Sequence, residues 1–387
     1  MPDATCGGCG CACDDIEATV VDGRLSLERT CPLGDAWFAE RTGERPPRAS
    51  IDGREVSVEE AADAAAAILR EARAPLVYGL GQTSCEAQRR AVALAEALGA
   101  VVDPAGGGGA GFAYQAIGAS TATFGEIRDR AELVVAWRAD PAVTNPRLLG
   151  RLRVEAKPLV VVDAVRTATA EQADAFIALD AAREVEALWA LRALVTGAPL
   201  DASRAEALDH LAERLRGARH VAFLYGALDE PAALALFSLV RDLARDRHAV
   251  TLGLRGDGNG RGAEDVLAWQ TGFPSAVSFA RGHPRANPGE LGAGALLERG
   301  EVDAALVVAA DPLDALPGLR ELPLVVVDAR ATATAQAARV AFATAADGIE
   351  VAGTIHRMDG VPVPLRAPLG GERPSTEDVL AAIAERV

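Results

Sequence analysis

The sequence predicts an α/β protein with two related, Rossmann-like parallel-sheet units and a small cysteine-rich domain at the N-terminus. Three observations support this fold class. Short Val- and Leu-rich runs alternate with helical segments, five of the six cysteines lie within the first 31 residues, and several motifs occur twice in the same order. Continuous apolar strands between helices are typical of a parallel sheet covered on both faces.

Length and composition narrow the class of protein. The chain has 387 residues, of which 50% are hydrophobic and 24% charged, with a formal net charge of −16. That length predicts two or three domains. The acidic balance argues against binding to nucleic acid or to an anionic membrane surface, because both require a basic patch. The chain opens without a basic and apolar leader, and no apolar run approaches a membrane span, so we expect a soluble cytoplasmic protein.

The first 45 residues differ from the rest of the chain. They contain the cysteine cluster and two short alternating segments, residues 16–21 and 25–27, which predict a β-hairpin. Asp22–Gly23 supplies the turn, since both residues tolerate the left-handed conformation that such turns require. A unit this small buries little apolar surface, so we predict that residues 1–45 form a domain stabilised by a bound metal group.

Helices and strands then alternate. Val58–Glu71 has helical periodicity, and residues 84–98 predict a second helix with Ser84 as N-cap, although Thr83 competes for that role. Three apolar runs predict buried strands, namely Pro75–Gly79, Leu133–Trp137 and Leu159–Asp163. The order predicts βαβ connections and therefore a parallel sheet.

Several motifs are repeated. Pro158-Leu-Val-Val-Val-Asp163 recurs as Pro323-Leu-Val-Val-Val-Asp328, and each copy is followed by Thr-Ala-Thr. Asp140–Pro141 after one strand recurs as Asp311–Pro312, and Tyr78–Gly79 recurs as Tyr225–Gly226. We therefore predict a duplicated unit, although Val-rich strands could also resemble each other by chance. The predicted divisions are residues 1–45, 46–200, 201–345, and a C-terminal segment 346–387 that packs on the α/β core.

The strand-end aspartates Asp163 and Asp328 have two possible roles. Ligands of open parallel sheets bind beyond the carboxyl ends of the strands, where both residues lie. An aspartate there can equally cap the following helix, and the sequence leaves both roles open.

Four cysteines are spaced as ligands of one metal group. Cys6, Cys9 and Cys13 come from a compact loop, and Cys31, followed by Pro32, comes from a separate segment. This pattern favours a [4Fe-4S] cluster, with a structural zinc ion and an empty remnant as alternatives. Cys11 is off the spacing and is treated as spare. Cys85 lies at a predicted helix start, where its pKa could be lowered, but a packing role is the more common one.

These residues resemble a known family, the B subunits of formylmethanofuran dehydrogenase, nearly from end to end. The N-terminal motif is Cys6-Gly-Gly-Cys-Gly-Cys-Ala-Cys-Asp-Asp15. The further matching blocks are Pro75-Leu-Val-Tyr-Gly79, Thr83-Ser-Cys-Glu-Ala-Gln88, Gly125-Glu126, Arg130-Ala131, Asp140-Pro141, Pro146-Arg147, Trp269-Gln-Thr-Gly-Phe-Pro274, Arg281-Gly-His-Pro-Arg285, Asn287-Pro-Gly-Glu290, Gly353-Thr354 and Arg357-Met-Asp-Gly-Val-Pro362.

The resemblance implies a molybdopterin oxidoreductase-like fold. Archaeal members carry a [4Fe-4S] cluster and a tungsten or molybdenum bis-pterin centre that interconverts carbon dioxide and formate. In a bacterial branch, the B subunit is part of a formyltransferase/hydrolase complex of tetrahydromethanopterin-dependent one-carbon metabolism, from formaldehyde to formate. Its implied partners are a formyltransferase, an amidohydrolase-like hydrolase and a C subunit, which carry the chemistry.

One departure from the dehydrogenases decides between the branches. There a Cys or selenocysteine in a Cys-His-Gly-Pro block ligates the metal, whereas residues 104–111 here contain no Cys, Ser, Asp or His. We therefore expect a structural subunit without catalytic residues and without molybdopterin or tungsten, because a redox metal needs its ligand and the groups that orient that ligand. The alternative is an active tungsten or molybdenum dehydrogenase whose metal is held by pterin thiolates alone.

A remnant of the pterin pocket is also expected. Arg281, Arg285 and Asn287, with Asp163 and Asp328, are the residues that the resemblance suggests for pterin contacts. Guanidinium groups match phosphate oxygens. If the pocket is vestigial, we expect these arginines to be buried and paired with carbonyl or carboxylate groups such as Glu290.

Overall fold

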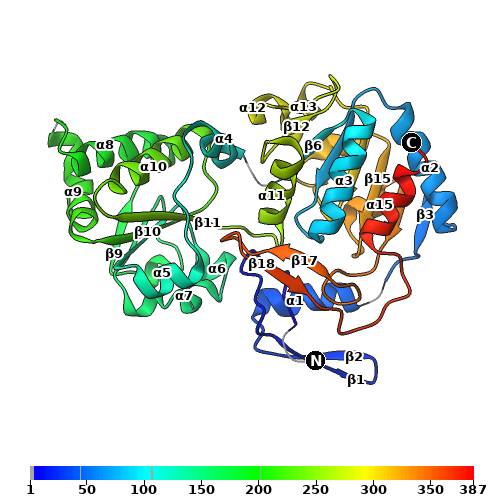
Figure 1. Cartoon of the computed structure of the whole chain (residues 1–387), viewed down its shortest axis with the longest axis horizontal. Helices are drawn as coiled ribbons and strands as arrows, with labels where there is room; N and C mark the ends of the chain where they lie inside the picture. The colour runs from blue at the N-terminus through cyan, green and yellow to red at the C-terminus, as the bar shows by residue number, and fades with distance from the viewer. Residues whose placement is uncertain (1–3, 44, 106–107, 201) are drawn as a thin grey trace. The chain divides into compact units, whose positions relative to one another are not determined.

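The chain folds into two α/β units whose boundaries differ from the predicted ones. The computed structural model describes residues 4–43, 45–105, 108–200 and 202–387. Unit 1 comprises Met1–Gly107 and Asp257–Val387, and unit 2 comprises Gly108–Gly256. Figure 1 follows the chain through both units. The cysteine-rich N-terminus and the C-terminal segment both belong to unit 1, so neither is a separate compact body.

Unit 1 is built on a nine-stranded sheet in the order β13-β12-β6-β5-β14-β15-β16-β3-β4. The five strands from β6 to β16 in this order run parallel, and the short outer strands are antiparallel. The strands are β3 (Ala49–Ile51), β4 (Arg54–Glu55), β5 (Pro75–Gly79), β6 (Val101–Asp103), β12 (Val277–Ser278), β13 (Arg285–Ala286), β14 (Ala304–Val308), β15 (Leu324–Asp328) and β16 (Val340–Ala343).

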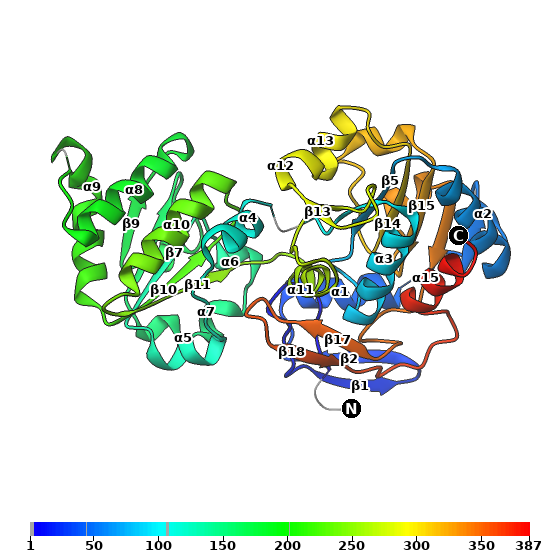
Figure 2. The same ribbon diagram turned by 45° about the horizontal axis from the view of Figure 1, so that its top comes forward.

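Helices cover both faces of this sheet. Val325 and Val327 pack on one side with Leu69, and Leu324 and Val326 pack on the other side with Leu296. The alternation follows from the two-residue period of a strand. The first face carries α2 (Val58–Glu71), α3 (Cys85–Leu98), α11 (Gly260–Thr271) and α15 (Thr376–Ala384); the second carries α13 (Ala293–Glu298), η4 (Pro317–Glu321) and α14 (Ala333–Ala337). The short helix α12 (Pro288–Leu291) follows β13 in the chain. Figure 2 shows α2, α3 and α15 against the sheet.

Unit 2 is a smaller version of the same arrangement. Its five parallel strands have the order β11-β10-β7-β8-β9. The strands are β7 (Leu133–Trp137), β8 (Leu159–Asp163), β9 (Ala175–Ala178), β10 (His220–Tyr225) and β11 (His248–Gly253). The helices are α4 (Gly108–Ile117), α5 (Phe124–Arg130), α6 (Pro141–Thr144), α7 (Leu148–Arg151), η1 (Val154–Ala156), η2 (Ala170–Gln172), η3 (Ala181–Arg183), α8 (Glu184–Thr196), α9 (Ala202–Gly217) and α10 (Glu230–Leu243).

The predicted repeats are present, but each of them contributes strands to both sheets. The first repeat supplies β5 to β9 and the second supplies β10, β11, β14, β15 and β16. The order β6-β5-β14-β15-β16 in unit 1 matches β11-β10-β7-β8-β9 in unit 2. The strands that end at Asp163 and Asp328 therefore occupy equivalent positions, as expected for a duplication. The first two strands of each repeat pair with the last three strands of the other, so units that follow the predicted division into residues 46–200 and 201–345 do not form.

The repeated Asp and Thr residues form the same contact in both units. Asp140 Oδ1 accepts hydrogen bonds from the backbone N–H and the hydroxyl of Thr169, at 2.8 and 2.6 Å. Asp311 Oδ1 accepts the same pair of bonds from Thr334, at 2.9 and 2.5 Å. The contact ties the loop after one strand to the loop after the next. The Tyr-Gly repeat is shifted by one residue. Gly79 pairs with Val308 of β14 and Tyr225 pairs with Trp137 of β7, and these two positions are equivalent in the two sheets.

Two hairpins complete unit 1. The predicted N-terminal hairpin is confirmed as β1 (Glu17–Val21) and β2 (Arg24–Glu28), and both turn residues, Asp22 and Gly23, have positive φ. The second hairpin, β17 (Gly353–His356) and β18 (Pro362–Leu365), lies in the C-terminal segment. Ser84 is the N-cap of α3, as predicted, and accepts from the N–H of Ala87. In the part of the chain that the structure describes, no helix combines the length and the apolar character of a bilayer span.

The repeated Asp–Thr contact predicts matched losses of stability. Replacing Thr334→Val or Thr169→Val removes a buried hydroxyl that donates to a carboxylate. We expect each change to lower the free energy of unfolding by about 1.5–3 kcal/mol, the usual value of a bond to a charged group. Chemical denaturation measures the effect. Thr196→Val, on an exposed face of α8, is the control and should change stability by less than about 0.5 kcal/mol.

The Thr334 effect should also depend on pH. Burial raises the pKa of Asp311, but the bonds from Thr334 and from the Ala333 N–H outweigh it and hold the pKa below its ordinary value of 3.8. A lowered native pKa stabilises the fold above the unfolded pKa, and this stabilisation is lost as pH falls through the native pKa. The difference between wild type and Thr334→Val should therefore shrink in acid. A difference that stays constant with pH would contradict this assignment.

Candidate functional site

The cysteines gather at one point in unit 1. The loop of residues 6–13 closes on itself, since the N–H of Cys6 donates to the carbonyl of Cys13 at 2.9 Å. Cys31 lies in the same region and is the N-cap residue of α1 (Pro32–Thr42). Pro32 follows at the first helical position, where the missing backbone N–H of a proline costs no helical hydrogen bond. The side chains of Cys6, Cys9 and Cys13 are no more than 7% exposed.

The four predicted ligands interact electrostatically. Burial raises the pKa of the Cys6 thiol to about 12, and the neighbouring Cys13, Cys9 and Cys31 add to the shift, although a hydrogen bond from the Gly8 N–H opposes it. The coupling shows that sequence-distant Cys31 lies near the loop cysteines. A thiol with such a pKa is neutral at pH 7, so a bound cation is needed to hold Cys6 as a thiolate.

Cys11, treated as spare from its spacing, lies within the same cluster. Its thiol forms hydrogen bonds with those of Cys13 and Cys9, and these contacts with burial raise its pKa well above 9.0. Cys85 is separate from the cluster. Burial raises its pKa to about 11, against the hydrogen bond with Asn259. The possible lowered pKa of Cys85 is therefore wrong, and its packing role stands.

The cysteines can be compared with the groups that four thiolates usually hold. Among the residues that the structure describes, no three or more His, Cys, Asp or Glu side chains converge on a position for one ion. A structural zinc ion requires four ligands that converge in this way. A cubane cluster carries each thiolate on a different iron atom and spreads the sulfurs further apart. A zinc ion and a cluster at these cysteines thus both stay predictions.

Glycines allow the loop to approach its surroundings. A Cβ at Gly34 would lie 3.2 Å from Cys6 Sγ and 3.9 Å from Cys31 Sγ, so a side chain there would crowd both thiols. A Cβ at Gly258 would overlap the carbonyl oxygen of Gly7. The backbone of the cysteine loop thus rests directly on the segment that leads into α11. The other side of the loop is held by β17–β18, where Ala12 packs with Ile355.

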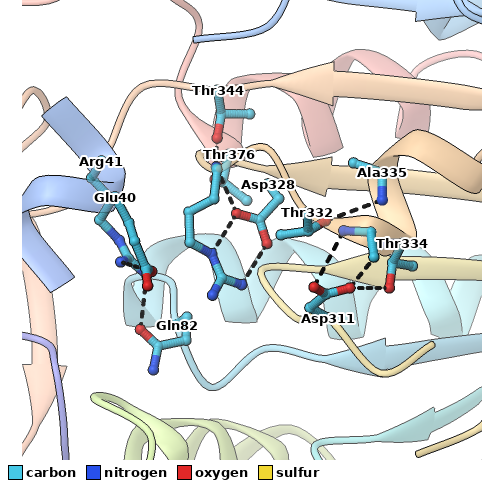
Figure 3. Close-up of polar contacts among 12 residues, drawn as sticks. Glu40, Arg41, Gln82, Asp311, Asp328, Thr332, Thr334, Ala335, Thr344 and Thr376 are labelled. Carbon is cyan, nitrogen blue, oxygen red and sulfur yellow. Dashed lines mark hydrogen bonds and ion pairs between the residues drawn. The ribbon is translucent and has the colours of Figure 1, made fainter. Parts of the chain in front are cut away.

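Trp37 and Arg41, two side chains of α1, link the cysteine loop to the loop after β5. Arg41 donates to Gln82 Oε1 at 3.0 Å, and Trp37 Nε1 donates to the same oxygen at 3.1 Å. Figure 3 shows Arg41 beside Gln82. A Cβ at Gly7 would lie 2.8 Å from the indole of Trp37, so the backbone of the cysteine loop packs closely against that ring. Arg41 and Gln82 were not among the predicted site residues; the spacing of Trp37 and Arg41 on one helical face after Cys31-Pro32 was the available signal.

The strand-end aspartates, predicted as possible cofactor contacts, face arginines of this chain. Asp328 is 2% exposed and accepts two bonds from the Arg330 guanidinium, at 3.0 and 2.8 Å. In unit 2, Arg138 lies 3.7 Å from Asp163 and 3.4 Å from Glu184. The Asp328 carboxylate is shown in Figure 3. Both carboxylates are thus committed to internal ion pairs.

The other predicted pterin residues lie on the surface of unit 1. Arg281, Arg285 and Asn287 are exposed, and Asn287 donates to Glu290 Oε2 at 3.0 Å. Within the described residues, the guanidinium groups of Arg281 and Arg285 form no hydrogen bond and no ion pair. The expectation that these arginines would be buried and paired is therefore wrong. They lie around the short strand β13 at an edge of the sheet, where water solvates their charge.

The glycine-rich run follows β6. Asp103 accepts from the N–H of Ala105 at 2.9 Å and from that of Ala293 at 2.7 Å. Gly106 and Gly107 lie outside the described residues, and α4 begins at Gly108.

Comparisons with known proteins place these observations in context. No family model matches the chain. The B subunit of the tungsten-containing formylmethanofuran dehydrogenase 2 of Methanocaldococcus jannaschii is 34% identical over 399 residues, covering 93% of this chain and 92% of that protein. The B subunit of the formyltransferase/hydrolase complex Fhc of Methylorubrum extorquens is 29% identical over 276 residues, covering 68% and 74%.

Solved structures agree with the sequence comparisons. A chain of the formyltransferase/hydrolase complex FhcABCD from Methylorubrum extorquens, crystallised with methylofuran, matches with a TM-score of 0.74 and 26% identity. The match covers 87% of this chain and 98% of that one. Acetylene hydratase from Pelobacter acetylenicus matches with a TM-score of 0.69 over the whole of this chain and 69% of its own, at 15% identity, which bears on the fold alone. The predicted fold class is confirmed.

The close approach at Gly258 makes a testable prediction. Gly258→Ala places a methyl group against the Gly7 carbonyl, so the cysteine loop must shift. We expect a loss of about 1–3 kcal/mol in the free energy of unfolding, as for other overpacked positions, and faster proteolysis within residues 1–45. Gly256→Ala is the matched control, because its Cβ meets no atom within 4 Å. Equal behaviour of the two variants would show that the loop does not depend on this contact.

Proposed function

Because the chain belongs to the family of formylmethanofuran dehydrogenase B subunits, we propose that it is the B subunit of a formyltransferase/hydrolase complex. This complex would act in tetrahydromethanopterin-dependent one-carbon metabolism, in which formaldehyde is converted to formate. The chain would be a structural subunit, with formyl transfer and hydrolysis in a formyltransferase, an amidohydrolase-like hydrolase and a C subunit. Its match to 98% of a chain of the FhcABCD complex supports this assembly.

The absence of a metal ligand from residues 104–111 carries the proposal. No side chain in this run offers a thiolate, hydroxylate, carboxylate or imidazole. A catalytic metal requires such a ligand and groups that orient it. The internal pairs of Asp328 and Asp163 support the same conclusion, because carboxylates already held by arginines offer little to a pterin cofactor.

The proposal includes a [4Fe-4S] cluster on Cys6, Cys9, Cys13 and Cys31. The burial of Cys6, Cys9 and Cys13 and the electrostatic coupling of Cys6 to the other three thiols support it. A cluster supplies folding energy when ligands from separate segments are joined by it. Here it would join the loop of residues 6–13 to the start of α1. The chain's own residues would exclude water, and the Gly8 N–H, 3.3 Å from Cys6 Sγ, would donate to a thiolate.

One specific observation favours a different function. The tungsten-containing relative of Methanocaldococcus jannaschii matches more of this chain than the Fhc relative does, at 93% against 68%. Under this alternative, the chain would be the catalytic subunit of a dehydrogenase, with tungsten or molybdenum held by pterin thiolates alone.

Purification of the native complex separates the two functions. We expect iron and acid-labile sulfide without tungsten or molybdenum, and we expect mass spectrometry to identify a formyltransferase and a hydrolase that co-purify with the chain. Metal analysis and dye-linked formate oxidation are the measurements. Stoichiometric tungsten or molybdenum, or formate oxidation above the background of the assay, would overturn the structural role.

The cluster is tested separately in the chain itself. We expect Cys9→Ser to lose most of the bound iron and to make residues 1–45 sensitive to protease, because one corner of the cluster loses its ligand. Cys11→Ser and Cys85→Ser are matched controls: each removes a buried thiol outside the ligand set and should keep the iron. Retention of iron in Cys9→Ser, or its loss in Cys11→Ser, would contradict the assigned ligands.

A further inference from the structure

Arg41 is a buried cation that forms no ion pair with a buried carboxylate among the described residues. It is 3% exposed and lies on α1, one turn after Trp37. Its guanidinium donates to the Trp37 carbonyl at 3.1 Å and to Gln82 Oε1 at 3.0 Å, and both acceptors are neutral. Among the described residues, the carboxylate within ion-pair distance is that of Glu40, at 3.7 Å on a side chain that is 58% exposed.

Two partly buried arginines nearby are neutralised. Arg330 forms a bidentate pair with Asp328, and Arg45 lies 3.0 Å from Glu350, whose side chain is 18% exposed. Isolated buried charges are costly, so they are retained where an opposite charge or a function compensates for them. Arg41 therefore calls for a negative group that is not one of these carboxylates.

Trp37 links Arg41 to the cysteine loop. The guanidinium carbon of Arg41 lies over the Trp37 ring, 4.5 Å from its centre, and a Cβ at Gly7 of the cysteine loop would lie 2.8 Å from Cζ2 of the same indole. Burial, and then the like charge of Arg330, lower the pKa of Arg41 to about 10, while the negative charges of Asp328, then Glu40, then Cys6 act in the opposite direction. Asp328 is held in a bidentate pair by Arg330, and Arg41 stays protonated at neutral pH within electrostatic range of Cys6.

We propose that Arg41 is the counter-charge of the four-thiolate site and raises the reduction potential of the cluster held there. This inference rests on the proposed cluster. One-electron reduction by an external donor breaks no bond and adds one negative charge to the site. A fixed cation nearby stabilises the reduced form more than the oxidised form, and net charge around a cluster is a principal control of its potential. Gln82 is the positioning residue, because its amide oxygen holds the guanidinium beside Trp37 without cancelling the charge.

The test uses the full-length chain, reconstituted anaerobically with iron and sulfide. Midpoint potentials are measured by redox titration followed by electron paramagnetic resonance, with iron content determined in parallel. We expect Arg41→Gln to shift the midpoint to a more negative potential and Arg41→Lys to remain close to wild type, because lysine retains the charge.

A second variant keeps the test independent of the folding of Arg41→Gln. Gln82→Glu places a carboxylate where the amide oxygen now accepts from Arg41, so it cancels the charge while both donors keep an acceptor. We expect the same negative shift. The control is the double variant Arg45→Gln/Glu350→Gln, which removes a compensated pair without changing net charge and should leave the midpoint unchanged.

The outcomes distinguish the two proposals. A wild-type chain that takes up no iron–sulfur cluster would refute the cluster itself. A loaded chain in which Gln82→Glu and Arg41→Gln titrate at the wild-type potential would overturn the role of Arg41 while leaving the cluster intact. An equal negative shift in the Arg45/Glu350 double variant would also overturn it, since the effect would then not be specific to the uncompensated charge.

Discussion

The pairing of β5 with β14 is the constraint on which the arrangement of unit 1 depends. β5 comes from the first repeat and β14 from the second, yet they form neighbouring parallel strands in the middle of the sheet. Parallel strands need both faces covered, so helices from both repeats, α3 and α11 among them, pack on the sheet around this pair. The carboxyl end of β5 then carries Gln82, and the segment before α11 carries Gly258. Gln82 contacts Trp37 and Arg41 of α1, and Gly258 contacts Gly7 of the cysteine loop, so the sheet positions the cysteine region.

Charge compensation divides the polar residues of the two units into distinct groups. The strand-end carboxylates Asp163 and Asp328 are neutralised by arginines, and Asp140 and Asp311 are used to join loops. These contacts stabilise the sheets and occupy the strand-end carboxylates. Arg41 differs, because among the described residues no buried carboxylate forms an ion pair with it. The occupied strand-end carboxylates and the cation near Cys6 connect the proposed structural role to the proposed iron–sulfur cluster.

Much of the site was accessible from the sequence. The spacing of Cys6, Cys9, Cys13 and Cys31 indicated one cluster of thiols, because ligand spacing in a short loop is a local property. The surface position of Arg281 and Arg285 was not accessible. Their motif implied a pocket, but the exposure of a side chain depends on which strand lies at the edge of the sheet. Gln82 was missed for a related reason: its contact with Arg41 joins segments that only the packing of α1 on the β5 loop brings together.

The sequence by itself determined the α/β class, the hairpin at Asp22–Gly23, the N-cap at Ser84 and the existence of two repeats, because each follows from local periodicity, turn chemistry or repeated motifs. Tertiary structure alone decided that the repeats exchange strands. Every strand of the repeats has a similar apolar pattern, so the pattern cannot specify whether β5 pairs with β7 or with β14. That choice depends on long-range packing of helices on both faces of each sheet. It makes compact units whose boundaries, at Gly107 and Asp257, no repeat in the sequence marks.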